Sequence, residues 1–191
     1  MKNITLIALS ILLCCACIGC ASEPTAEPPA PVTVEEPVRG TIDLSTFTAE
    51  DFDGNIQSGA LFSEHKLTMI NIWATFCGPC LNEMPDLQAL TEQYGDEFQL
   101  IGIPVDIVDR NGNVLPEKRT EAETMLELTG VTYPQLLPSR SLNELYLSGV
   151  QVIPVTLFFD ENGVILDAEY YGSRSLDDWK QIVDGYLEAL S

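Results

Sequence analysis

The stretch Trp73-Ala74-Thr75-Phe76-Cys77-Gly78-Pro79-Cys80 places two cysteines three residues apart, where an apolar segment gives way to a helical pattern. At the start of a helix, residues i and i+3 lie on one face, at a spacing that a disulfide can bridge. A disulfide between Cys77 and Cys80 can therefore form and break with little backbone movement. Cys77 also faces the positive end of the helix dipole, which favours the thiolate. We expect Cys77 to be the attacking nucleophile and Cys80 the resolving thiol.

A cysteine pair at this spacing can also be half of a structural zinc site, which needs four ligands. The single histidine is His65, and the other four cysteines lie in the N-terminal apolar segment, at Cys14, Cys15, Cys17 and Cys20. A tetrahedral site cannot be completed from these residues, so we expect no bound metal. No haem or nucleotide motif is present in the sequence, and we expect no cofactor besides the redox-active cysteine pair. A permanent disulfide remains an alternative, although closing so short a loop constrains the unfolded chain little.

The first 20 residues have the plan of a secretory signal peptide. Lys2 precedes an apolar run over residues 4–18 that is short for a transmembrane helix. The segment Cys17-Ile18-Gly19-Cys20 resembles the lipobox of bacterial lipoproteins, in which cleavage precedes a cysteine that carries the lipid. Cys17 stands where that motif prefers leucine, so cleavage before another cysteine or an uncleaved anchor stays open. We expect a lipid on Cys20 and a membrane-anchored, extracytoplasmic protein.

Residues 21–41 are rich in Pro and Glu and predict a semi-rigid spacer without chemistry of its own. Residues 42–191 are long enough for one folded domain, which we expect to be a monomer. The formal net charge of the chain is −20. So acidic a surface repels nucleic acid and anionic lipid headgroups, and neither is an expected partner.

Strand and helix patterns alternate along this domain. In chain order they predict an entry hairpin over 41–55, a strand over 66–73, a helix over 79–95 kinked at Pro85, a strand over 98–105, a helix over 117–129, a short strand over 132–137, a short helix over 141–146, a hairpin of strands 155–160 and 164–170, and a helix over 176–190. This order indicates an α/β fold whose sheet is mostly parallel at first and antiparallel at its end.

Residues 42–191 resemble the thioredoxin superfamily and, within it, the membrane-anchored TlpA/ResA-like thiol:disulfide oxidoreductases. The segment from Trp73 to Cys80 matches the core W-A-x-x-C-x-P-C of that family. The resemblance implies a thioredoxin fold, in which helices flank a central mixed sheet, with an N-terminal hairpin and a central strand-helix insertion. It also implies that Gly78 and Pro79 support the active site, and that Trp73 either packs beneath it or contacts substrate.

Two positions outside the motif also match the family. Ile153-Pro154 corresponds to the segment whose cis proline packs beside the disulfide, the alternative being an ordinary proline at the start of a strand. Thioredoxins place an acid in the strand before the motif, where this chain has Asn71. Glu83 matches the active-site glutamate of ResA-like proteins and is the candidate general base, because apolar surroundings raise the pKa of a carboxyl. The alternative is a solvent-exposed helix glutamate.

The resemblance implies dithiol/disulfide exchange on exported protein disulfides, with a CcdA-type membrane protein as electron donor. Because Leu81 and Asn82 follow the cysteines, no neighbour in sequence is cationic, and the helix terminus alone is expected to acidify Cys77. One alternative is a thiol-dependent peroxidase of the AhpC/TSA type, whose T-x-x-C pattern and upstream proline this chain lacks. Another is a copper or other metal chaperone, which adds a distal histidine, whereas none follows His65.

Overall fold

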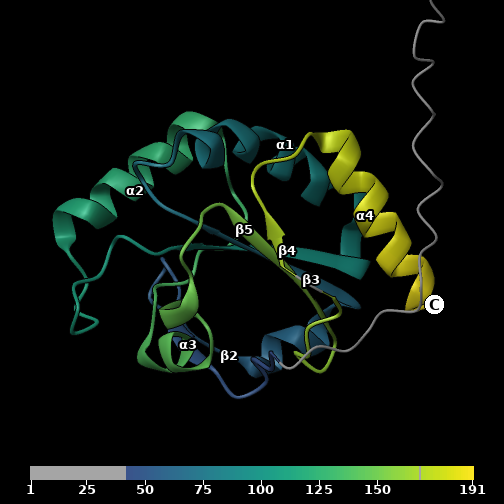
Figure 1. Cartoon of the computed structure of the whole chain (residues 1–191), viewed down its shortest axis with the longest axis horizontal. Helices are drawn as coiled ribbons and strands as arrows, with labels where there is room; N and C mark the ends of the chain where they lie inside the picture. Colours follow the sequence, from purple (N-terminus) through teal and green to yellow (C-terminus); the bar gives the residue numbers. More distant parts are fainter. Residues whose placement is uncertain (1–41, 168) are drawn as a thin grey trace, which may run out of the picture. The chain divides into compact units, whose positions relative to one another are not determined.

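A computed structural model describes residues 42–167 and 169–191 (Figure 1). The predicted signal peptide, the lipidation of Cys20 and the spacer over 21–41 lie outside these residues. Among the helices that the structure describes, none is long and apolar enough to cross a membrane.

A four-stranded mixed sheet in the order β4-β3-β5-β6 forms the centre of the domain. Its strands are β3 (Leu67–Trp73), β4 (Phe98–Pro104), β5 (Val155–Asp160) and β6 (Tyr170–Tyr171). β3 runs parallel to β4 from Leu67↔Phe98 to Trp73↔Pro104, whereas β5 runs antiparallel to β3, and β6 antiparallel to β5. The predicted change from parallel to antiparallel pairing is confirmed.

Layers of other elements cover both faces of the sheet, which is why every residue of β3 is buried. The helices α1 (Gly78–Tyr94) and α4 (Leu176–Ala189) pack on one face (Figure 1). Their core joins Met69 and Phe158 of the sheet to Trp179 of α4. On the other face lie β1 (Thr48–Glu50), β2 (Ile56–Ser58), the 3-10 helices η1 (Gly59–Glu64) and η3 (Leu147–Gly149), and α3 (Arg140–Leu145). Here Phe62 packs against Phe159 of β5.

The predicted entry hairpin is confirmed as the antiparallel pair β1 and β2, whose second strand begins just after the predicted range. Asp51 closes its turn, because one carboxylate oxygen accepts the main-chain N–H groups of Asp53 and Asn55. Because these hydrogen bonds are local, the acidic, glycine-containing turn can be predicted from the sequence.

A central insertion consists of α2 (Pro116–Thr129) and the segment that follows it. The prediction of a strand over 132–137 is wrong, since this segment makes only isolated bridges, from Gln135 to Gly102 and from Leu136 to Asp51. It crosses the edge of β4 at Gly102, whose N–H donates to Pro134 O and whose carbonyl accepts from Leu136 N. Bonding on one side to β4 and on the other to the entry hairpin leaves no continuous ladder.

The last sheet strand is also shorter than predicted, since only residues 170–171 form β6 instead of 164–170. The pairing with β5 is interrupted, because Ile165 and Tyr170 are five positions apart whereas their partners Phe159 and Thr156 are three apart. The other edge of the segment bonds to the N-terminal residues of the domain. Ile165 N donates to Ile42 O, and Leu44 N donates to Gly163 O. Only one bridge, Phe159↔Ile165, then continues the pairing with β5.

Two carboxylates of α1 hold the segment that leads into α4. Glu83 accepts the main-chain N–H of Arg174, and Asp86, three residues further along α1, accepts that of Leu176. Ser175 caps α4 through a reciprocal bond with Asp178. The start of the last helix is therefore fixed directly to the helix that carries the cysteines.

Candidate active site

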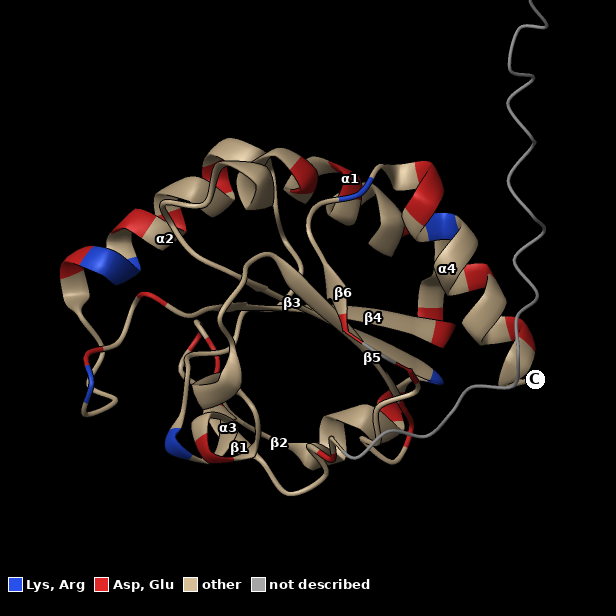
Figure 2. Ribbon diagram, viewed as in Figure 1, with Lys and Arg blue, Asp and Glu red and all other residues tan. Residues whose placement is uncertain are grey.

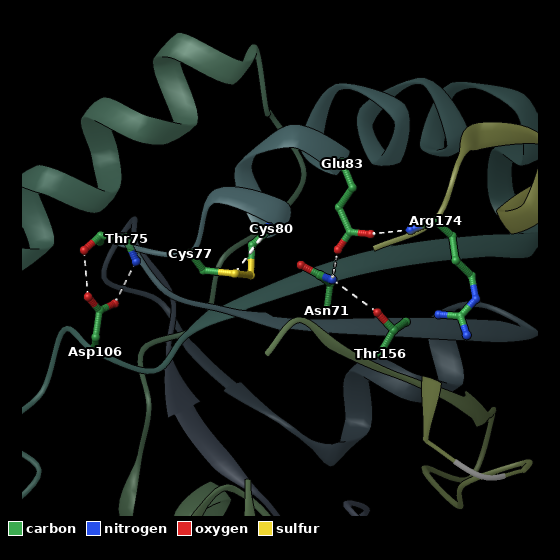
Figure 3. Close-up of a disulfide and its surroundings, with 8 residues drawn as sticks. All are labelled: Asn71, Thr75, Cys77, Cys80, Glu83, Asp106, Thr156 and Arg174. Carbon is green, nitrogen blue, oxygen red and sulfur yellow. Dashed lines mark hydrogen bonds between the residues drawn. A yellow bond between two sulfur atoms is a disulfide. The ribbon is translucent and has the colours of Figure 1, made fainter. Parts of the chain in front are cut away.

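The two motif cysteines form a disulfide at the first turn of α1, with their Cα atoms 5.3 Å apart (Figure 3). Cys77 is the N-cap residue, and its sulfur accepts the N–H of Cys80. Gly78 and Pro79 occupy the first helical turn, where a missing N–H costs nothing. Cys77 is 7% exposed and Cys80 is fully buried. Cys77 therefore presents the sulfur that an incoming thiol or disulfide can reach.

The proline segment lies beside this disulfide. The Ile153-Pro154 peptide bond is cis, so the expectation of a cis proline at this position is confirmed. Ile153 packs against the cluster of buried side chains that contains both cysteines. Pro154 is buried directly before β5, and its carbonyl accepts the N–H of Gly172.

Trp73 is fully buried under the motif, so the alternative in which it contacts substrate is not realised here. Its indole Nε1 donates to Oε1 of Gln135, 3.0 Å away, in the segment after α2. Gln135 in turn donates to the carbonyl of Tyr133. Trp73 thus acts in packing, and the insertion satisfies its one polar atom.

Glu83 lies inside the protein, which excludes the alternative of a solvent-exposed glutamate. It is 2% exposed, and Asn71 Nδ2 donates to its Oε1 at 3.1 Å, while Arg174 N donates to its Oε2 at 3.2 Å (Figure 3). Burial raises the pKa of Glu83 to about 7, against the opposing effect of these donors and of the Arg174 charge. Asn71 also donates to Thr156 Oγ1. A carboxyl that titrates near neutral pH therefore lies one helical turn after Cys80.

The turn before Cys77 contacts two charged residues that the sequence around the motif does not indicate. Asp106, just after β4, accepts two hydrogen bonds from Thr75, and Lys118 of α2 donates to the Thr75 hydroxyl. A cationic side chain therefore does reach the motif, from 43 residues further along the chain. The expectation that no cationic side chain lies beside the motif is therefore wrong, whereas acidification of Cys77 by the helix terminus stays a prediction.

An apolar groove of about 330 Å³ opens beside the disulfide. Phe76 of the motif and Ile153 of the proline segment lie in its wall, and Leu147 of η3 lines it as well. The Phe76 side chain is 73% exposed, so its ring can contact a chain bound in the groove. The cysteines themselves do not line the groove, but Phe76 directly precedes Cys77, and Ile153 packs against the cluster that contains both cysteines.

Comparison with known proteins agrees with this geometry. Residues 43–168 match the model of the AhpC/TSA family. The chain belongs to the AhpC/TSA family. A thiol-disulfide oxidoreductase ResA from Geobacillus thermodenitrificans is 30% identical over 141 residues, which are 70% of this chain and 73% of the relative. The thioredoxin-like protein YneN of Bacillus subtilis is 29% identical over 140 residues, covering 71% of this chain and 76% of the relative.

A solved structure of a thiol:disulfide interchange protein of the thioredoxin family, from Chlorobium tepidum, is similar with a TM-score of 0.60. It is 25% identical, and the match covers 78% of this chain and 96% of the other. The domain thus has the thioredoxin fold implied by the motif. Together with the Cys77–Cys80 disulfide, these relatives identify the chain as a thiol-disulfide oxidoreductase of the ResA type.

Proposed function

We propose that this protein is a membrane-anchored, extracytoplasmic reductase of disulfides in exported proteins. The observation that carries the proposal is the unequal access to the two sulfurs, since Cys77 is 7% exposed and follows Phe76 of the apolar groove, whereas Cys80 is fully buried. A polypeptide disulfide in the groove meets Cys77 first, and only the mixed disulfide is then within reach of Cys80.

In the reduced protein the Cys77 thiolate attacks one sulfur of the client disulfide. The client S–S bond breaks, a Cys77–client bond forms, and the second client sulfur leaves as a thiolate that takes a proton from water. The Cys80 thiolate then attacks the Cys77 sulfur, which forms the Cys77–Cys80 disulfide and releases the first client sulfur. Two electrons pass to the client, and the protein is left oxidised.

Cys80 must lose its proton before this second attack, in surroundings that exclude solvent. Glu83 is the acceptor that we assign, because it lies one turn further along α1 and has a pKa of about 7. Arg174 and Asn71 fix its two oxygens in place. At neutral pH this carboxyl exists in both states and can take the Cys80 proton and release it later.

A further dithiol must reduce the Cys77–Cys80 disulfide after each turnover. We assign this role to a membrane electron donor of the CcdA type, following the resemblance of the domain to TlpA/ResA-like proteins. A lipid on Cys20 and the spacer over 21–41 would keep the domain at that membrane. Replacement of Cys20 by serine, followed by fractionation and by mass spectrometry of the N terminus, tests the anchor separately from the chemistry.

Variants of the two cysteines test the exchange reaction directly. Cys80→Ser should retain attack on insulin disulfides and accumulate a mixed disulfide, visible after acid quenching and non-reducing electrophoresis. Cys77→Ser should form no such adduct. Turnover by the Cys77→Ser variant at the wild-type rate would overturn the proposal. A reduction potential near the roughly −270 mV of thioredoxin supports a reductase, whereas one near the roughly −120 mV of DsbA indicates an oxidase.

The peroxidase and metal-chaperone alternatives have less support. Thr75 lies two residues before Cys77, and its hydroxyl donates to Asp106. This differs from the T-x-x-C pattern, in which threonine lies three residues before the nucleophile. Consumption of hydrogen peroxide by the reduced protein at a rate that exceeds insulin reduction would favour a peroxidase. Stoichiometric copper in the purified reduced protein would favour a chaperone.

A further inference from the structure

A carboxylate fixes the turn that presents Cys77. The N–H of Cys77 donates to Ala74 O, so Thr75 lies in the middle of a tight turn. Asp106 binds this residue twice, since Oδ1 accepts Thr75 N at 3.0 Å and Oδ2 accepts Thr75 Oγ1 at 2.6 Å (Figure 3). Both the main chain and the side chain of the turn are therefore held by one group, and Thr75 itself is buried.

Lys118 extends this arrangement to the insertion. Its Nζ donates to Thr75 Oγ1 at 3.2 Å and lies 3.7 Å from Asp106 Oδ2. It also forms an ion pair with Glu121, one turn further along α2. Figure 2 shows that basic residues occupy the start of α2, whereas most charges on the described elements are acidic. The Thr75 hydroxyl thus donates to an anion and accepts from a cation.

The geometry points to Asp106 and Lys118 as positioning residues for Cys77, through which α2 acts on the nucleophile. This inference rests on the proposed attack by Cys77. Asp106 sets the direction of the sulfur by fixing the turn. Lys118 supplies a positive charge that offsets Asp106 and favours the thiolate, in addition to the helix terminus, whose effect equals only about half a unit charge.

The other charged side chains near the first turn of α1 are each bound to partners of their own. Glu121 adds a negative charge next to Lys118, and Glu83 lies deeper along α1 with Asn71 and Arg174. Arg119, although adjacent to Lys118, is directed to the Phe52 carbonyl and to Glu123. Lys118 is therefore the cationic side chain that contacts the turn before the nucleophile.

The test compares two lysines that differ in place but not in chemistry. Lys118→Met removes the cation at the turn. Lys66→Met is the control, because Lys66 also forms an ion pair with a glutamate, Glu97, but lies just before the first residue of β3, at the end far from the cysteines. The reduced full-length protein is alkylated with iodoacetamide between pH 5 and 9. Alkylation of Cys77 is located by tandem mass spectrometry of the peptide that contains Cys77 and Cys80, so that neither Cys80 nor the four N-terminal cysteines interfere.

Lys118→Met should slow alkylation of Cys77 about threefold below neutral pH, because a removed cation disfavours the thiolate. Lys118→Arg should restore the rate, and Lys66→Met should leave it unchanged. Asp106→Asn should shift the pH profile in the opposite direction, since it removes an anion. Salt at 1 M should reduce both shifts, because it screens the charges.

Equal profiles for Lys118→Met and Lys66→Met would overturn the inference. A shift in the same direction for Lys118→Met and Asp106→Asn would also overturn it, since that result indicates general loosening of the turn. In either case, continued reduction of insulin disulfides by these variants would leave the proposed function standing. Loss of the mixed disulfide in the Cys80→Ser protein would instead remove the function itself.

Discussion

The main-chain N–H of Arg174 donates to Oε2 of Glu83 across 91 residues of sequence. The Arg174 guanidinium is held separately, since it donates to the carbonyls of Tyr171 and Gly172 and lies about 5 Å from the ring centres of Tyr170 and Trp179. A fixed cation and a fixed donor therefore act on the same buried acid, and the cation can be removed while the main-chain donor stays.

Replacement of Glu83 by glutamine should change how stability depends on pH. The pKa of Glu83 is raised from the usual 4.5 to about 7 by burial, so between these values the folded chain keeps a proton that the unfolded chain has lost. Wild-type stability therefore falls as the pH rises through this window. The free energy of unfolding of Glu83→Gln, relative to that of wild type, should therefore rise by on the order of 3 kcal/mol from pH 4 to pH 8. Urea unfolding of the two oxidised proteins at both pH values measures this change. The same difference in stability at pH 4 and pH 8 would contradict the prediction.

The same variant should slow the second step of exchange and spare the first. Glutamine cannot take the Cys80 proton, so release of the client from the mixed disulfide should slow on the order of 100-fold at pH 7. Alkylation of Cys77 should be nearly unchanged. Quenched-flow analysis of the mixed disulfide separates the two steps. If both steps slow equally, Glu83 acts on the whole site and not as the base for Cys80.

Replacement of Arg174 by methionine should move the pH profile of the second step upward. The charge of Arg174 lowers the pKa of Glu83, so its loss makes the carboxyl harder to ionise, while the main-chain donor remains. Loss of the contacts with the two aromatic rings should also cost about 1–2 kcal/mol of stability. Arg140→Met is the matched control, because the Arg140 side chain is 92% exposed. A profile that does not move would show that the Arg174 charge has no effect on the base.

Replacement of Gly102 by alanine should disrupt the hydrogen bond that holds Trp73 in place under the motif. A Cβ at Gly102 would lie 2.0 Å from Gln135 Oε1, the atom that accepts the Trp73 indole N–H. Either that bond breaks or the chain shifts, and we expect a loss of about 2–3 kcal/mol. Gly149→Ala, where a Cβ meets no atom within 4 Å, is the control for thermal unfolding. Equal melting temperatures of Gly102→Ala and Gly149→Ala would mean that the Gln135 side chain can move away without loss of stability.

The sequence predicts those features whose causes are local. The CGPC turn, the buried strand before it and the acidic turn at Asp51 each follow from spacing, apolar runs or turn-forming residues. The order of the helices and strands also follows, because each pattern is continuous over several residues. Ile153-Pro154 lies far from the cysteines in sequence, and the family resemblance, not a local pattern, indicates it.

The remaining features depend on contacts that no local pattern encodes. Lys118, Gln135 and Arg174 reach the site across 43, 62 and 91 residues, and each looks like an ordinary polar surface residue in the sequence. The burial of Glu83 likewise depends on how α4 packs onto α1. The segment 132–137 has the composition of a strand, but its hydrogen bonds go to two different partners.

The start of α4 is attached to α1 by two carboxylates, and only one of them takes part in the proposed chemistry. Glu83 changes its protonation state in every proposed cycle. If it were the single attachment of the segment before α4, its hydrogen bond to Arg174 would weaken at each change. Asp86 accepts the N–H of Leu176 three residues further along and holds the same helix start independently of that cycle. The base can therefore alternate between its two states while the last helix remains docked, so that turnover needs no repacking of the core.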